Sequence, residues 1–313
     1  MVRIVDRPTL SVGIPVWNGE MFLAQTIESL LAQDYESIEI IILDNMSTDR
    51  TSEICKQYAK KDARVKYILD ESQRDVMQAH KVIARMANTE FFMVACDDDW
   101  YAPRYVSTLM SLMLSNPSVG LAYSGLGWIG SDGSKKESGF NRFLTRRNSK
   151  FNNFASYLFW RNPLPIVFGI VRTEIHKDAL NYFYRPDNRG WDHDNLYMLR
   201  LLSMTHVDSV KEVLFYYRQQ DRDVLYKKRG QYYQPQKAFN KVVNHVSHQI
   251  SLTCAVAKII DASHFSSAQK IILRAYSYVV LLFNCGPRYF VAYCWKSAVL
   301  RKLRVHMLVE HNR

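Results

Sequence analysis

The chain has 313 residues, of which 48% are apolar and 13% aromatic. This is enough for one large domain, or for one domain plus an appendage, and it argues against a disordered chain. Its five cysteines are scattered without a CxxC pair, which argues against a zinc site or a disulfide framework and indicates a reducing compartment. We expect no signal peptide and no membrane span, because no window reaches the roughly 18 consecutive apolar residues that a span needs.

The net charge of +11 is unevenly distributed along the chain. Residues 227–313 contain 14 Lys and Arg but only 2 Asp and Glu, so residues 1–226 are close to neutral. A basic core is thereby excluded, and nucleic acid is a poor primary ligand for it. We therefore expect a catalytic or binding domain over 1–226 and a basic helical region over 227–313.

The first 130 residues alternate between predicted strands and helices. Apolar runs predict the strands, and apolar side chains at helical spacing predict the helices. The repeated βα units predict an α/β fold with a mainly parallel, doubly wound sheet flanked by helices. The predicted strands are residues 10–16, 38–43, 64–69, 91–96 and 119–123, and the predicted helices are one capped by Asn18, residues 51–60, residues 76–87 and one opened by Pro103.

The pattern becomes less regular after a predicted turn at residues 131–134. Residues 134–165 are basic and aromatic without clear periodicity, which predicts a long functional loop. Residues 166–171 predict another strand, and residues 190–203 predict a helix with an acidic start.

Three consecutive carboxylates, Asp97, Asp98 and Asp99, follow the predicted strand 91–96. They repel one another unless a cation neutralises them, and the carboxyl ends of strands are where open α/β sheets bind ligands. Mg²⁺ and Mn²⁺ prefer such oxygen ligands and often share them with substrate phosphates. The triplet predicts a divalent metal that holds a phosphorylated substrate, and the alternative is an acidic loop or a helix cap.

Four segments resemble, in order and spacing, the family 2 glycosyltransferases, which have the Rossmann-like GT-A fold. The resemblance covers about residues 9–220, and it implies a nucleotide-sugar half over about 1–130 and an acceptor half over about 131–226. The four segments are residues 11–19 (SVGIPVWNG), residues 43–51 (LDNMSTDRT), the Asp triplet with Pro103, and residues 191–194 (WDHD) leading into 199–201.

The resemblance implies that the first two segments and Asp97 bind the donor nucleotide. Trp17 takes the place of an aromatic residue that stacks on the base, while Pro15 and Asn18 shape the turn. A buried core position for Trp17 and a simple cap for Asn18 are the alternatives. Asn45 stands where the family usually has an acid that reads the base, so the base and the donor class stay open.

The resemblance further implies that the triplet binds Mn²⁺ or Mg²⁺, with Asp98 as the principal ligand between Asp97 and Asp99. Cys96 stands at the family's usual first acid, and we interpret it as a small buried residue. Asp192 matches the family's catalytic base, which takes a proton from the acceptor hydroxyl. An N-cap role is the alternative for Asp192, and the two roles are compatible.

These assignments predict an inverting, metal-dependent glycosyltransferase. It would move a sugar from a nucleotide sugar, with a UDP-sugar preferred, to a saccharide or lipid-linked saccharide acceptor. The resemblance also suggests cell-envelope polysaccharide synthesis and a cytoplasmic location, peripheral at the inner face of the membrane.

Residues 268–304 combine aromatic and basic side chains, which predicts either association with an anionic membrane surface or a helical subdomain packed on the core. One alternative function is a sugar-phosphate nucleotidyltransferase, which the lack of a Gly-rich phosphate loop after the first strand disfavours. The other is a catalytically degenerate GT-A-like protein that acts as a membrane-surface binding module.

Overall fold

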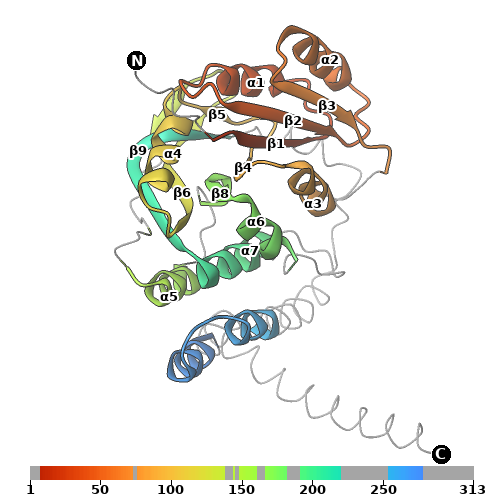
Figure 1. The fold of residues 1–313 in the computed structure, drawn as a ribbon. Coiled ribbons are helices and arrows are strands. Elements are labelled where there is room, and N and C mark those ends of the chain that lie inside the picture. Colours follow the sequence, from red (N-terminus) through yellow and green to blue (C-terminus); the bar gives the residue numbers. More distant parts are fainter. Residues whose placement is uncertain are drawn as a thin grey trace, which may run out of the picture. The chain divides into compact units, whose positions relative to one another are not determined.

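The computed structural model describes residues 8–72, 76–137, 144, 148–160, 166–181, 191–219 and 253–277, without the side chains of 76–77, 159–160 and 191–193. The chain divides into two compact units, Met1–Gln231 and Tyr232–Arg313. In the second unit the described residues 253–261 and 267–277 are helical. The first unit carries the sheet and all the residues assigned to a site (Figure 1).

One mixed sheet forms the centre of the first unit. Among the described residues it has nine strands in the order β3-β2-β1-β4-β8-β6-β9-β5, with β7 beside β6. Strands β1 to β4 pair in parallel as the βα units predict, β6 and β9 are also parallel, and β8 is antiparallel to both β4 and β6. The strands are β1 (Leu10–Val16), β2 (Ile38–Asp44), β3 (Val65–Leu69), β4 (Phe91–Val94), β5 (Trp100–Tyr101), β6 (Val119–Ile129), β7 (Lys135–Glu137), β8 (Ile170–Arg172) and β9 (His206–Arg218).

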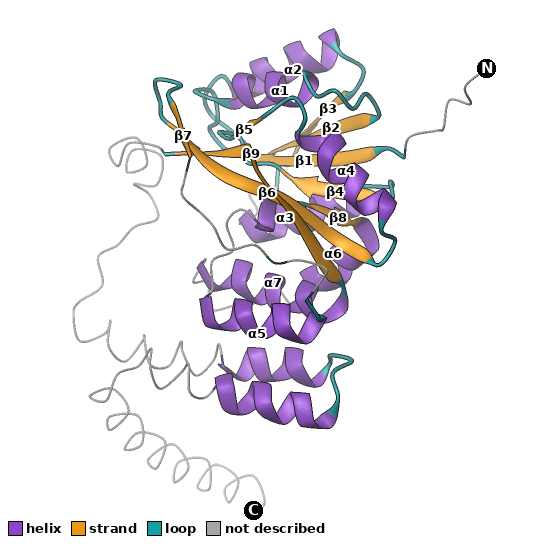
Figure 2. Ribbon diagram, turned by 90° about the vertical axis from the view of Figure 1, so that its left-hand side faces the viewer, coloured by secondary structure: helices purple, strands orange, loops and turns teal. Residues whose placement is uncertain are grey.

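Helices cover both faces of the sheet (Figures 1 and 2). Helices α1 and α2 lie on one face, α3 and α6 lie on the other, and α5 packs against α7. The helices are α1 (Leu23–Leu31), α2 (Thr51–Lys61), α3 (Val76–Met86), α4 (Tyr105–Ser115), α5 (Lys150–Trp160), α6 (Thr173–Leu180) and α7 (Trp191–Met204), with a 3-10 turn at Ile166–Phe168.

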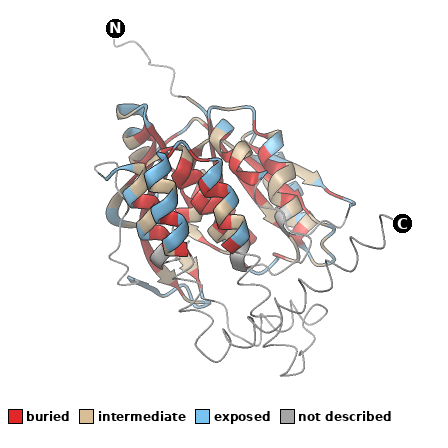
Figure 3. Ribbon diagram, turned by 90° about the horizontal axis from the view of Figure 1, so that it is seen from below, coloured by how far each residue is buried: buried red, intermediate tan, exposed pale blue. Residues whose placement is uncertain are grey.

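Strand β1 shows why the sequences of the central strands are continuously apolar. Leu10, Val12 and Ile14 are completely buried in one core. Gly13 points to the opposite face, where a Cβ would lie 2.9 Å from the ring of Phe92. Because both faces of the sheet are covered, the strand needs apolar side chains on both faces. The helices in Figure 3 have buried residues on one side and exposed residues on the other.

The predicted bounds of β1 are confirmed, whereas the predicted helix start at Asn18 is wrong. Helix α1 begins at Leu23. Asn18 has a φ of 51°, a left-handed conformation that asparagine tolerates better than most residues and that a helix N-cap does not use. Residues 18–22 therefore form a turn, and the helix starts where the apolar side chains meet the core.

Several elements were not anticipated, among them α6 and the short strands β5 and β7, and the reasons are clearest for α5 and β9. Residues 150–160 were expected to be irregular but form α5, whose buried Phe154, Tyr157 and Leu158 recur at helical spacing. Strand β9 has 13 residues and pairs with β6 through several register shifts. Those irregularities, and the exposed Lys211 and Glu212 in its middle, break the alternation by which a strand is recognised.

Candidate functional site

The loops after β1 and β2 are tied together by hydrogen bonds at the carboxyl ends of these strands. The Asn18 backbone N–H donates to Ser47 Oγ at 2.9 Å, and the Thr48 N–H donates to Asn18 Oδ1 at 2.8 Å. The Gly19 N–H donates to Thr51 Oγ1 at 2.8 Å. Asn18 therefore joins the two loops, and it does not cap a helix.

The end of β2 is ordered by a buried carboxylate. Asp44 is completely buried, and its two carboxylate oxygens accept from the Ser47 N–H at 2.9 Å and the Tyr67 hydroxyl at 3.0 Å. Asn45 follows, half-buried, and its N–H donates to the Val16 carbonyl at 2.9 Å. Asp44 thus has a structural role, and Asn45 lies directly beside the end of β1.

Asp97 is brought against the first loop by a glycine. A Cβ at Gly19 would lie 2.6 Å from Asp97 Oδ2 and 2.6 Å from Val16 Cγ2, so the carboxylate occupies space that any other residue would fill. Pro15 and Trp17 lie half-buried at the same end of β1. The structure therefore brings together the first three segments that the sequence singled out.

Asp99 is the most unusual carboxylate of the triplet. It is completely buried, and its Oδ1 accepts from the Arg218 backbone N–H at 2.9 Å. Its Oδ2 has no hydrogen-bond partner among the described residues. Burial and the neighbouring charge of Asp98 raise the pKa of Asp99 well above its ordinary value. An unpaired buried carboxylate oxygen is costly, and a cation would relieve that cost.

Asp98 and Asp99 belong to a cluster that could hold a metal ion. Cys96 Sγ and one oxygen of each carboxylate all lie within 4.8 Å of one another. Two carboxylates fit the preference of Mg²⁺ and Mn²⁺ for oxygen ligands, whereas a thiol is softer than these ions prefer. Asp97 lies outside this cluster, and burial with the nearby carboxylate charges raises the pKa of Cys96.

Arg218 lies beneath the triplet at the end of β9 and was missed in the sequence. Its Nε donates to the Asp98 carbonyl at 2.5 Å, and its two terminal nitrogens donate to the Gly130 carbonyl at 2.8 Å and to Gln25 Oε1 at 2.9 Å. The guanidinium carbon lies 4.0 Å from the centre of the Phe22 ring. The sequence offers one weak signal, an arginine at the end of an apolar run.

Asp192 lies in the first turn of α7, and its side chain is outside the described residues. Its neighbour Asp194 contributes to the raised pKa of Cys96 through its charge. The first turn of α7 is therefore within electrostatic range of the cluster that contains Asp98 and Asp99.

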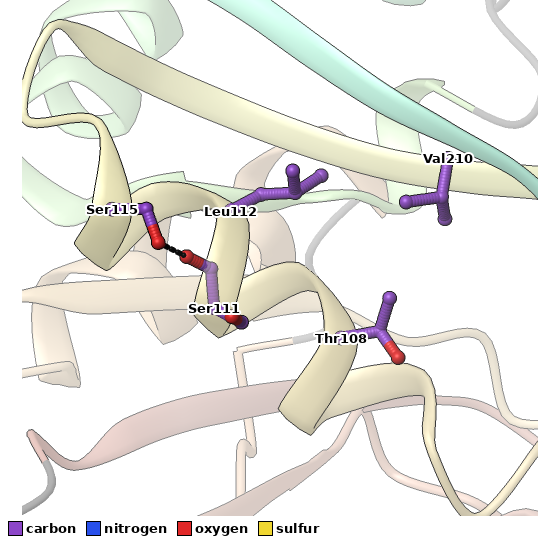
Figure 4. Close-up of a pocket in the computed structure, with 5 residues that line it drawn as sticks. All are labelled: Thr108, Ser111, Leu112, Ser115 and Val210. Atoms are coloured by element: carbon purple, nitrogen blue, oxygen red, sulfur yellow. Dashed lines mark hydrogen bonds between the residues drawn. The ribbon is translucent and has the colours of Figure 1, made fainter.

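A pocket of about 350 Å³ lies between α4 and β9 (Figure 4). Its lining has hydroxyl and aliphatic groups and no titratable side chain, so it offers no acid–base or metal chemistry. The lining residues are Thr108, Ser111, Leu112, Ser115 and Val210.

Residues 268–304, for which either membrane association or packing on the core was predicted, are described only over 268–277. There Ile271 and Ile272 are exposed, at 67% and 57% of their surface. Arg274 forms an ion pair with Asp261. None of the helices in the described parts of the chain has the length and hydropathy needed to cross a membrane.

Comparison with known sequences gives one family and several relatives. Residues 11–173 match the family described as Glycosyl transferase family 2. Glycosyltransferase GlyG of Streptococcus pneumoniae is 32% identical over 100 residues, which are 32% of this chain and 33% of GlyG. The GalNAc(5)-diNAcBac-PP-undecaprenol beta-1,3-glucosyltransferase of Campylobacter jejuni is 34% identical over 104 residues, 33% of this chain and 34% of that enzyme. The matched region thus spans about a third of these relatives.

Among solved structures, residues 1–349 of S. aureus TarS in complex with UDP-GlcNAc resemble this chain with a TM-score of 0.63. The sequence identity is 18%, and the match covers 86% of this chain and 71% of that one. This likeness confirms the predicted fold class, a Rossmann-like sheet flanked by helices.

Proposed function

We propose, since the chain belongs to glycosyl transferase family 2, that it is an inverting, metal-dependent glycosyltransferase that uses a nucleotide sugar. One observation carries this proposal. The loops after β1 and β2 are hydrogen-bonded to each other, and the first of them meets the loop after β4 at Asp97, next to Asp98 and Asp99. One buried oxygen of Asp99 has no partner among the described residues. Such a site suits a cation shared with a diphosphate.

The donor nucleotide would bind along Pro15, Trp17, Asn18, Asn45 and Asp97. The amide of Asn45 can accept from a pyrimidine imide N–H through its oxygen and donate through its nitrogen, which suits a uridine or a thymidine nucleotide. TarS, which has the same fold, was solved with UDP-GlcNAc, and that supports a UDP-sugar as the donor.

Mn²⁺ or Mg²⁺ would be held by Asp98 and Asp99, with Asp97 beside them. When bound, the ion would supply Lewis-acid stabilisation of the diphosphate leaving group. The protein's own part is to keep these carboxylates together at the end of β4 while Gly19 leaves space for Asp97.

Asp192 is proposed as the general base that takes a proton from the attacking acceptor hydroxyl. Its place in the first turn of α7 supports this role, because the charge of Asp194 in the same turn acts on Cys96 of the proposed metal cluster. The acceptor is proposed to be a saccharide or a lipid-linked saccharide, since the name of the C. jejuni relative specifies an undecaprenol-linked acceptor. A cytoplasmic position at the inner face of the membrane, in cell-envelope polysaccharide synthesis, is part of the same proposal.

The test is calorimetric titration of UDP, dTDP and GDP, each with and without Mn²⁺. We expect UDP to bind in a metal-dependent way, and we expect Asp98→Ala to abolish this. The control is Asp62→Asn, whose carboxylate pairs with Arg64 ahead of β3 and should not affect nucleotide binding. If no nucleotide binds, the active-enzyme proposal fails and a degenerate, membrane-binding protein becomes the better explanation.

A second experiment separates chemistry from binding. Asp192→Asn should abolish sugar transfer while UDP and Mn²⁺ still bind, because the amide cannot take the proton. Full activity of this variant would remove Asp192 from the mechanism.

A further inference from the structure

We propose that Arg218 is a positioning residue that sets the shape and charge of the metal-binding loop. The inference rests on the proposed metal-dependent function and goes beyond it, because Arg218 belongs to none of the four segments and lies at the end of β9.

Arg218 bonds both members of the carboxylate pair, through the main-chain oxygen of Asp98 and through one of the two carboxylate oxygens of Asp99. Its Nε donates to the main-chain carbonyl of Asp98, and its backbone N–H donates to Oδ1 of Asp99. The second oxygen of Asp99, Oδ2, is left without a partner among the described residues. Arg218 thus orients the loop while it leaves that oxygen available to the cation.

The other nitrogens of Arg218 anchor it to two further elements. One donates to the carbonyl of Gly130, just after β6, and the other donates to Gln25 in α1. The planar guanidinium also lies over the Phe22 ring at 4.0 Å, in cation–π geometry. The metal-binding loop is therefore connected through one side chain to α1, β6 and β9.

The charge of Arg218 explains how the triplet is tolerated when no cation is bound. Three adjacent carboxylates repel one another, and Asp99 is completely buried. Arginine keeps its charge even when it is buried, so it can partly compensate these carboxylates. A lysine would keep the charge, but it lacks the fork that bonds Asp98, Gly130 and Gln25 at the same time.

Arg172 supplies a matched control at the opposite end of β4. Its Nε donates to the Val119 carbonyl at 3.2 Å, its guanidinium lies 5.1 Å from the Phe91 ring, and it pairs with Glu90. It has the same kinds of contact as Arg218, but it touches none of the proposed metal ligands.

The test compares Arg218→Lys, Arg218→Met and Arg172→Lys in the 313-residue chain. Free Mn²⁺ is measured by electron paramagnetic resonance during titration, so that no turnover is needed. Thermal unfolding without metal reports stability. We expect Arg218→Lys to weaken Mn²⁺ binding at least about tenfold, as losses beside metal ligands commonly do. Arg172→Lys should lose similar stability but stay within about twofold of the native Mn²⁺ affinity.

Three results would overturn the inference. They are a native Mn²⁺ affinity in Arg218→Lys, a native affinity in a folded Arg218→Met, and an equal loss of affinity in Arg172→Lys. If Arg218→Met does not fold, the lysine variant decides. If the native protein binds neither Mn²⁺ nor UDP, the proposed function has failed; if it binds both and Arg218→Lys binds equally well, only the positioning role has failed.

Discussion

The two ends of strand β4 differ in how far their acidic side chains are paired with basic ones. At the start of the strand, Glu90 pairs with Arg172, which also bonds a main-chain carbonyl and lies over an aromatic ring. At the other end, three carboxylates gather, and Asp99 is buried with one oxygen that has no partner among the described residues.

Both ends contain an arginine against an aromatic ring, so the difference is not in the type of side chain. At the first end the acidic partner is exposed and single, whereas at the second end the acids outnumber the arginine and one is completely buried. A cluster of like charges costs stability, and proteins retain such costs mainly at functional sites. The end of β4 at which the carboxylates are not fully compensated by arginine is therefore the end at which we expect the functional site.

The largest expected effect is that of Asp99→Asn, which tests whether the acids at the carboxyl end of β4 are kept for metal binding at a cost in stability. The amide keeps the acceptor for the Arg218 N–H but removes an acid whose ionisation is opposed by its burial, so the variant should unfold at a higher temperature, with a gain of about 1 kcal/mol. Its Mn²⁺ affinity should fall roughly 100-fold, because a proposed ligand is lost. Calorimetric unfolding and Mn²⁺ titration measure the two effects. A destabilised variant with native affinity would contradict the contrast.

His176 tests whether burial of an unpaired polar atom is sufficient to indicate function. Its ring packs on Phe92 with centres 4.7 Å apart, Nδ1 contacts the Tyr197 hydroxyl, and the buried Nε2 has no partner among the described residues. Burial, with the nearby charges of His80 and Lys177, lowers the pKa of His176 to about 3. No cluster of metal-ligating groups that includes it is found in the described parts of the chain.

We expect His176 to act through stability alone. It stays neutral in the folded state while the unfolded chain takes up a proton below pH 6.5, so stability falls as the pH drops from 6.5 towards 3. The loss between pH 7 and pH 5 should be about 2 kcal/mol. Denaturant unfolding of the native protein and His176→Asn at both pH values measures it. An equal pH dependence in both proteins would show that another group is responsible.

Gly19→Ala probes the space that the Asp97 carboxylate occupies. The new methyl group would lie 2.6 Å from Asp97 Oδ2, so Asp97 must move, and we expect about a tenfold loss of UDP affinity. Gly13→Ala, in the strand that precedes this turn, is the control, because its methyl group would meet Phe92 and Ile83 in the core. That control should lower stability by about 1–3 kcal/mol and leave UDP affinity unchanged. Titration and thermal unfolding distinguish the two; equal affinities would contradict a role for this space.

The smallest effect is expected at the compensated end of β4. Glu90 is 57% exposed, and its pair with Arg172 is screened by solvent, so Glu90→Gln should change stability by less than about 0.5 kcal/mol. Mn²⁺ affinity should not change. A loss of metal binding in this variant would show that the two ends are coupled and would remove the basis of the comparison.

Much of the fold could be predicted because its signals are local. Continuous apolar runs gave β1 and β2, and helical spacing gave α2 and α4. The Asp triplet was recognisable because three like charges directly follow a buried strand. The helix cap assigned to Asn18 was wrong, because a left-handed backbone conformation at a loop junction leaves no periodic signal.

The sequence alone determined the α/β class, the family resemblance and the end of the sheet at which to seek a site, because these depend on short segments and their order. Only the tertiary structure decided how the charges at that end are held. The bond from the Arg218 N–H to Asp99 joins residues 119 positions apart, and it forms because β9 ends beneath the loop after β4. Contacts across such a separation depend on how strands pair, and the periodicity of neither segment specifies them.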